Sequence, residues 1–427
     1  MKMLIKGGRV IDPANNIDAV KDLLIEDGLI SAIGMFDVSS GDVEVIDAKG
    51  LVVTPGFIDL HCHLREPGFE YKEDIESGSK SAVAGGYTTI CCMPNTSPVN
   101  DSAAVTHHIK KRAHEVNLVD ILPIGAISKG LKGEELSDIG DLAKAGCVAL
   151  SDDGKPVMNA SMMRRAMEYS LAFSLPIMSH CEDLDLSKDG VMNEGYTSTE
   201  LGFKGIPALA ETAMVMRDLR LSHLTGNRMH IAHVSNAESV EEIRRAKKAG
   251  WNISAEVTPH HLLMTEENCS GFDPNTKMKP ALGTDRDRKA LIEALSDGTI
   301  DAIATDHAPH AQVDKEVGFQ EAAFGVIGFE TTLQVSLKLV QEKKLTLKRM
   351  VEALTQMPAK ILKFTDRGSF SKGTKADITI FDPEVSVIVD PDKFHSKARN
   401  SAFHGWNLKG KVRYTIRDGK VVYKSSM

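Results

Sequence analysis

The sequence predicts an α/β protein: a (β/α)8 TIM-like barrel with a small β-sandwich domain built from both chain ends. The middle of the chain alternates short apolar runs with amphipathic helical stretches, whereas both ends consist of short strands joined by turn residues. The apolar runs of the middle number eight, which is the strand count of this barrel. The eight predicted strands are residues 57–63, 87–93, 119–126, 147–151, 176–180, 229–233, 253–257 and 301–305.

A doubly wound parallel sheet is the competing architecture for a chain of alternating strands and helices. That fold carries a Gly-Xaa-Gly-Xaa-Xaa-Gly or phosphate-binding loop after its first strand. Neither motif follows residues 57–63. The barrel, whose active sites lie where the strands end, is therefore the better prediction.

The two ends of the chain are expected to form one discontinuous β domain of residues 1–54 and 365–427, which flanks a barrel of residues 55–364. Short apolar runs in these ends are separated by Gly7-Gly8, Asp27-Gly28 and Asp418-Gly419. Such pairs between apolar runs favour β-hairpin turns. Neither end is long enough to bury a good core alone, so we expect the two ends to pair.

Composition restricts the kind of partner. The 427 residues carry a formal net charge of -8, which provides no basic field for nucleic acid or an anionic membrane. No apolar run is long enough to span a membrane, and the N-terminus lacks the apolar stretch of a signal peptide. The six cysteines form no Cys-Xaa-Xaa-Cys pair and are expected to be reduced. We therefore expect a cytoplasmic protein that binds a small molecule, with no nucleic-acid or membrane partner.

The first predicted barrel strand carries two histidines on one face. Pro-Gly pairs bracket it, and alternation along a strand sends His61 and His63 to the same side. Their Cα atoms would lie roughly 6.6 Å apart, which lets both imidazoles reach one ion. A histidine pair buried in a core is the alternative, which further ligands elsewhere would disfavour.

Further polar residues follow four other predicted strands. An aspartate pair, Asp152-Asp153, follows the fourth strand, and single histidines, His180 and His233, end the fifth and sixth. Asp306 follows the eighth strand. Because one barrel face would receive four imidazoles and two carboxylates, two bridged metal ions fit better than one. Nitrogen and oxygen ligands suit zinc, with manganese and cobalt as the other candidates.

The His-Xaa-His pair, the later single histidines and Asp306 resemble the amidohydrolase superfamily. Within it, six longer motifs closely resemble those of the bacterial class I dihydroorotases, and the similarity covers essentially the whole chain. The motifs are FIDLHCHLREPG at 57–68, MPNT at 93–96, SDDG at 151–154, HCED at 180–183, EVTPHHL at 256–262 and ATDHAPH at 304–310.

This resemblance implies reversible, metal-dependent hydrolysis of the cyclic amide of dihydroorotate to N-carbamoyl-aspartate, a step of pyrimidine biosynthesis. It implies one or two Zn2+ per chain, with Asp306 also the catalytic proton carrier. The implied metal ligands are His61, His63, Asp153, His180, His233 and Asp306. The implied substrate-binding residues are His63, Arg65, Asn95, Lys279, His310, Phe324 and Gly325.

The sequence departs from the family pattern in residues 277–283. Relatives usually carry Asn where Lys279 stands and Pro-Leu-Arg near the end of that run, so one substrate contact differs from the pattern. We also expect a homodimer, and aspartate transcarbamoylase is the partner enzyme that the family suggests.

Two other functions compete with this one. Hydantoinases and allantoinases of the same superfamily bridge their metals with a carboxylated Lys at the end of strand four. Residues 147–151 contain no Lys, and Lys155 lies beyond a glycine and is expected to face solvent, so Asp153 is the expected bridge. The second alternative is a catalytically dead scaffold for aspartate transcarbamoylase, which should have lost ligands, whereas all six are present.

Overall fold

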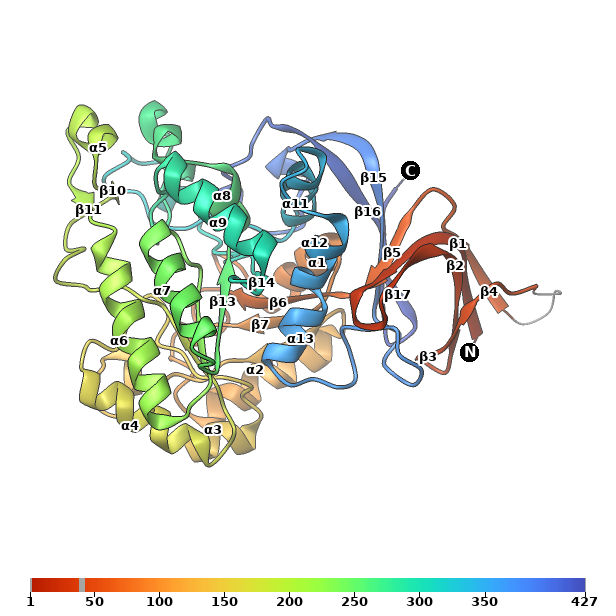
Figure 1. Cartoon of the computed structure of the whole chain (residues 1–427), viewed down its shortest axis with the longest axis horizontal. Coiled ribbons are helices and arrows are strands. Elements are labelled where there is room, and N and C mark those ends of the chain that lie inside the picture. Colours follow the sequence, from red (N-terminus) through yellow and green to blue (C-terminus); the bar gives the residue numbers. More distant parts are fainter. Residues whose placement is uncertain (1, 38–42, 427) are drawn as a thin grey trace.

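The computed structural model describes residues 2–37 and 43–426 (Figure 1). It consists of a barrel surrounded by helices and a β domain at one side, in which strands from the two ends of the sequence lie together. Both parts of the expected architecture are confirmed. No helix among the described residues is long and apolar enough to cross a membrane.

The β domain is built on one eight-stranded sheet. Its order is β17-β16-β15-β5-β1-β2-β3, with β4 also paired to β1. The two chain ends join where β15 runs antiparallel to β5, and residues from both ends, such as Ile5 and Ile378, share one buried apolar cluster. The strands are β1 (Lys2–Asp12), β2 (Ile17–Glu26), β3 (Leu29–Gly34), β4 (Val43–Asp47), β5 (Val52–Pro55), β15 (Ile378–Ile388), β16 (Asn407–Arg417) and β17 (Lys420–Lys424).

Two of the three predicted hairpin turns are confirmed. Asp27-Gly28 joins β2 to β3 and Asp418-Gly419 joins β16 to β17, with all four residues at positive φ. The turn predicted at Gly7-Gly8 is wrong, because β1 continues through it and pairs with β2 on both sides of a bulge. The two glycines form part of this bulge instead. The Gly7 N–H donates to the Asp22 side chain, Oδ1, at 2.8 Å and not to a backbone carbonyl of β2.

The barrel strands are parallel and form a three-stranded sheet, β6-β7-β8, and a four-stranded sheet, β9-β12-β13-β14. Parallel bridges from Leu150 to Gly125 and Ile177 join the two sheets on one side, and a bridge from Cys62 to His307 closes the ring on the other. The strands are β6 (Phe57–Cys62), β7 (Tyr87–Cys92), β8 (Asp120–Pro123), β9 (Ile177–Ser179), β12 (Met229–Ile231), β13 (Ile253–Val257) and β14 (Ala302–Ile303).

The predicted strand at residues 147–151 is wrong as a regular strand. These residues nevertheless fill the fourth position of the ring, because Ser151 N donates to Gly125 O and Leu150 N to Pro176 O. The segment has one bridge on each side and is followed by the turn at Asp153-Gly154. The ring is thus closed by this irregular segment.

Helices cover the outside of the ring, with apolar faces against the strands (Figure 1). The longer ones are α1 (Ile75–Ala84), α2 (Ala103–Val116), α3 (Ile139–Ala145), α4 (Ala160–Leu171), α6 (Leu209–Thr225), α7 (Ala237–Lys248), α9 (Asp285–Asp297), α11 (Thr332–Gln341) and α12 (Leu347–Leu354). Shorter elements are α5 (Tyr196–Leu201), α8 (Pro259–Leu263), α10 (Gln312–Lys315), α13 (Gln356–Ile361), β10 (Met192–Asn193), β11 (Gly205–Ile206), η1 (Pro13–Asn15), η2 (Lys129–Leu131), η3 (Glu266–Gly271), η4 (Pro274–Thr276) and η5 (Pro391–Lys393).

Candidate metal centre

Six buried side chains meet at the carboxyl ends of the barrel strands. Each comes from a strand or from the first residues after it, because parallel strands deliver their carboxyl ends to one face of the barrel. All six are at most 6% exposed. They are His61 on β6, His63 just after it, Asp153 after the fourth ring position, His180 after β9, His233 after β12 and Asp306 after β14.

The six residues form two overlapping groups of potential metal ligands. His61, Asp153 and His233 form one group, and His61, His63 and Asp306 the other, with the ligand atoms of each group within 4.8 Å of one another. His180 joins the first group, because its Nδ1 lies 3.4 Å from Asp153 Oδ1. The arrangement brings together every metal ligand that the sequence predicted.

The donor atoms fit a divalent metal ion. His61 Nε2 and Asp153 Oδ1 lie 3.3 Å apart, yet neither forms a hydrogen bond with any described residue. His180 Nδ1 and His233 Nε2 face each other at 2.8 Å. Buried polar atoms are normally satisfied, so the unpartnered His61 Nε2 and Asp153 Oδ1, which face one another, indicate a site for a cation. Imidazole and carboxylate donors are those that zinc accepts.

A second layer of residues orients the histidines. His61 Nδ1 lies 2.9 Å from Glu256 Oε1, which leaves Nε2 facing the centre. In the same way Glu182 Oε2 lies 3.0 Å from His180 Nε2, and Asn95 Oδ1 lies 2.9 Å from His63 Nδ1. Such partners fix the tautomer and direction of a metal-binding imidazole.

The carboxylates of this second layer were missed by the sequence reasoning, although both lie inside the motifs quoted above. Glu256 is fully buried between His61 and His230, whose Nε2 lies 2.9 Å from Glu256 Oε2. Burial raises the pKa of Glu256, but His230 and His61 outweigh it and lower that pKa to about 2. Glu256 is therefore an anion that can orient and polarise His61.

Thr305, the residue before Asp306, is held by two hydrogen bonds to Asp59. Asp59, on the same face of β6 as His61, accepts hydrogen bonds from Thr305 N at 2.8 Å and from Thr305 Oγ1 at 2.6 Å. Asp306 itself adopts φ 44°, a left-handed conformation, as does His233 at φ 33°. Strained backbone at two of the six positions is typical of residues held in place for function.

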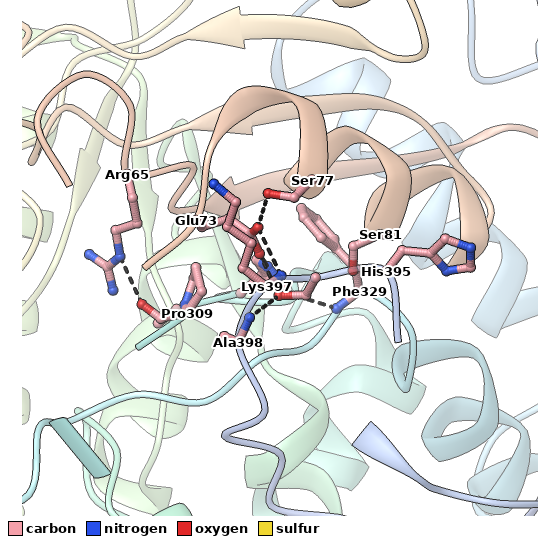
Figure 2. A network of polar contacts seen from close by, with 12 residues as sticks. Arg65, Glu73, Ser77, Ser81, Pro309, Phe329, His395, Lys397 and Ala398 are labelled. Atoms are coloured by element: carbon pink, nitrogen blue, oxygen red, sulfur yellow. Dashed lines mark hydrogen bonds and ion pairs between the residues drawn. The ribbon is translucent and has the colours of Figure 1, made fainter. Parts of the chain in front are cut away.

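The predicted substrate-binding residues lie on loops at this same end. Arg65 Nε donates to Pro309 O at 3.1 Å, and its terminal nitrogens form no hydrogen bond or ion pair within the described part of the chain (Figure 2). His310 Nε2 donates to Phe324 O at 2.8 Å. Burial and then the charge of Arg65 lower the pKa of His310 to about 3, so this imidazole is neutral.

Two predicted substrate contacts are engaged with residues of the metal centre. Asn95 bonds His63, as described above, and its Nδ2 lies 3.4 Å from Asp153 Oδ2. Lys279 Nζ lies 2.7 Å from Glu182 Oε1 and 5.1 Å from the centre of the Phe324 ring. Lys279 thus contacts both Glu182, which orients His180, and Phe324 of the predicted substrate loop. His180, Glu182 and Lys279 all help to line one cavity.

A (β/α)8 barrel with His-Xaa-His at the end of its first strand and further histidines and an aspartate at later strand ends, all able to bind a metal ion, is the arrangement of the amidohydrolase class. A family model described as Dihydro-orotase-like matches residues 50–239, and one described as Amidohydrolase family matches residues 193–423. Among solved structures, an L-hydantoinase from Arthrobacter aurescens superimposes with a TM-score of 0.90 at 27% identity, covering 100% of this chain and 96% of that one. A dihydropyrimidinase from Brevibacillus agri has a TM-score of 0.86 at 24% identity, covering 99% and 95%.

Relatives matched over their full length show which family of amidohydrolases the chain belongs to. The dihydroorotase of Acetivibrio thermocellus is 52% identical over 427 residues, which is 100% of both chains. The dihydroorotase of Geobacter metallireducens is 51% identical over 424 residues, which is 99% of this chain and 100% of the relative. The chain belongs to the dihydroorotase family.

Proposed function

We propose that the protein is a dihydroorotase, which reversibly hydrolyses the cyclic amide of dihydroorotate to N-carbamoyl-aspartate in pyrimidine biosynthesis. One observation carries this proposal: a buried centre of six candidate ligands is followed, two residues after His63, by Arg65, a guanidinium whose terminal nitrogens are not used within the described chain. The substrate is a cyclic amide with a carboxylate, and a guanidinium can bind a carboxylate through two parallel hydrogen bonds.

The residues of the centre would hold one or two Zn2+ ions: His61, His63, Asp153, His180, His233 and Asp306. When bound, zinc lowers the pKa of a water molecule toward neutrality and polarises the carbonyl to be attacked. Asp153 suits a bridging role, since Oδ1 faces His61, His180 and His233 at 3.3–3.6 Å and Oδ2 faces His63 at 3.5 Å.

Asp306 is the proposed proton carrier. Its Oδ1 lies 3.1 Å from His63 Nε2 and 3.6 Å from His61 Nε2, so the carboxylate would lie next to a water activated by metal at these histidines. As the water oxygen bonds to the carbonyl carbon, Asp306 accepts the water proton. When the carbon–nitrogen bond breaks, Asp306 returns that proton to the ring nitrogen, and ring closure uses the same steps in reverse.

Substrate binding is assigned to residues near the candidate metal centre. Arg65 would take the substrate carboxylate, and His63, Asn95, neutral His310 and the backbone of Phe324-Gly325 would offer hydrogen bonds to the ring. Lys279 lies at the edge of this group through its contact with Phe324.

A hydantoinase is the second candidate, because solved structures with that name share the fold. Two features of this chain favour a dihydroorotase: residues 147–151 contain no Lys, and Arg65 can pair with a carboxylate that hydantoin lacks. Assaying dihydroorotate, hydantoin and allantoin side by side tests the proposal. Faster hydrolysis of hydantoin or allantoin would overturn it.

For its setting we infer a cytoplasmic homodimer that associates with aspartate transcarbamoylase. The six cysteines are all free and buried, which suits a reducing compartment. Light scattering of the purified protein, alone and mixed with aspartate transcarbamoylase, tests both assemblies. A monomeric mass, or no change in mass on mixing, would contradict the corresponding assembly.

A further inference from the structure

A segment of the C-terminal region lies against the loop end of the barrel. Residues 395–400 connect η5 to β16 and follow an alternating pattern, with Ser396, Ala398 and Asn400 buried and Lys397 and Arg399 exposed. This is the pattern of an extended chain with one face packed against protein. The segment belongs to the chain end that completes the β domain, yet its buried face contacts the barrel.

Two carboxylates of the barrel, Glu73 and Glu330, anchor the start of the segment, and Figure 2 shows the contacts around Glu73. Glu73 is fully buried and accepts hydrogen bonds from Ser396 Oγ and, at 3.2 Å, from Lys397 N. Glu330 accepts from the backbone N–H of His395 at 2.8 Å, and its other oxygen lies 3.1 Å from His395 Nδ1. Hydrogen bonds to charged groups are stronger than neutral ones, so this end of the segment is firmly held.

Asn400, at the other end, uses its whole side-chain amide on two barrel loops. Its Nδ2 donates to Ala308 O and to Gly325 O, both at 3.0 Å. Its Oδ1 accepts from the backbone N–H of His310 at 3.2 Å. The backbone of Asn400 adds a fourth contact, because its carbonyl accepts from Ile327 N at 3.1 Å.

These two loops carry residues assigned above to substrate binding. One holds His310 and the other Phe324-Gly325, and the His310 side chain bonds Phe324 O across the gap between them. Gly325 has φ +120° and an added Cβ would lie 2.8 Å from Ala308 Cβ, so the loops pack closely. Asn400 therefore ties the two loops together through its side chain, beside the backbone hydrogen bond from Ala308 N to Val326 O at 2.8 Å.

We propose that Asn400 is a positioning residue for substrate binding, supplied to the barrel by the C-terminal segment 395–400. Resting on the proposed function, the inference is that Asn400 fixes His310 and Gly325 at the distance that the substrate ring requires. Small displacements of binding groups weaken binding strongly, because the hydrogen bonds to the substrate depend on geometry. None of the six candidate metal ligands is bonded to Asn400, so the metal centre is not affected.

The Asn400→Ala variant tests this, because a positioning role predicts a large change in KM and a small change in kcat. We expect KM for dihydroorotate to rise at least 10-fold, kcat to stay within threefold, and metal content to equal that of the wild type. Loss of a contact that is equally strong in the ground state and the transition state raises KM and leaves kcat unchanged. An unchanged KM, or a fall in kcat that follows loss of metal, would overturn the proposal.

Asn227→Ala is the matched control. Asn227 is also a buried Asn whose Nδ2 donates to backbone carbonyls, those of Met167 and Leu175, but it lies before β12 at the opposite end of the barrel. We expect a lower Tm with unchanged KM, and a raised KM in this control would also count against a specific role for Asn400. If Asn400→Ala does not fold, Ser396→Ala removes one anchor of the same segment and should raise KM several-fold, whereas an unchanged KM contradicts the proposal.

Kinetics of the wild-type protein distinguish failure of the proposed function from failure of the positioning role of Asn400. Its rate with dihydroorotate tests the proposed function alone, without reference to Asn400. The ratio of variant to wild-type KM tests the positioning role, and is measured once that rate is established.

Discussion

Lys279 and Glu182 form an ion pair, with Nζ 2.7 Å from Oε1, directly behind a ligand of the candidate metal centre. The other oxygen of Glu182 lies 3.0 Å from His180 Nε2. Burial raises the pKa of Glu182, but His180 and Lys279 outweigh it and lower that pKa to about 2. Lys279 is therefore linked to the candidate metal centre through Glu182 as well as to Phe324.

The first prediction concerns Glu182. Glu182→Gln removes the charge that orients and polarises His180, so zinc affinity should fall about 10-fold or more. Lys279→Met should give a smaller loss in the same direction. Titration of metal-stripped protein against a coloured chelator measures both. Asp183→Asn is the control, because Asp183 caps the following turn through Asp185 N and should bind zinc normally. Wild-type affinity in Glu182→Gln would contradict this account.

Arg65→Met should raise KM for dihydroorotate about 10–100-fold, because the substrate carboxylate loses its charged partner. Metal content should be unchanged, since the Arg65 side chain bonds only Pro309 O among the described residues. Steady-state kinetics and elemental analysis check the two parts. Arg112→Met is the control. It removes a cation on α2 that pairs with Glu66 and Glu115, and it should leave KM unaltered. A parallel loss of metal in Arg65→Met would show that the residue is misassigned.

For Asp306→Ala we expect ring opening and ring closure to fall together, by about 100-fold to 10,000-fold, because one group carries the proton in both directions. Both directions are followed by ultraviolet absorbance. Asp301→Asn alters an aspartate just before β14, where it pairs with Lys247, and should affect stability without affecting either rate. Survival of either direction in Asp306→Ala would remove Asp306 from the proton path.

The last prediction concerns the bridging ligand. Chelation should abolish activity, and metal alone should restore it in bicarbonate-free buffer, because Asp153 already supplies the carboxylate between the histidines. Lys155 is exposed, so Lys155→Ala should keep activity within twofold. Asp153→Ala should lose at least one metal ion by elemental analysis. A bicarbonate requirement that disappears in Lys155→Ala would reverse the assignment.

Local patterns in the sequence determined the fold class and the convergence of the candidate ligands. Strand alternation places His61 and His63 on one face, and parallel strands deliver His180, His233 and Asp306 to the same end. Asp27-Gly28 and Asp418-Gly419 specify their turns because positive φ is a property of the turn residues themselves. These features depend on neighbours in the chain, so a single sequence contains them.

Only the tertiary structure decided which residues support those ligands. Glu256 bonds His61 from 195 positions away, Lys279 reaches Glu182, and Asn400 reaches Ala308 from 92 positions away. Gly7-Gly8 differs from the other Gly-containing pairs for the same reason, since its role depends on Asp22 in the neighbouring strand. Such contacts form when the ring closes and the β domain folds against it, and no local periodicity records the distance between two side chains that meet only then.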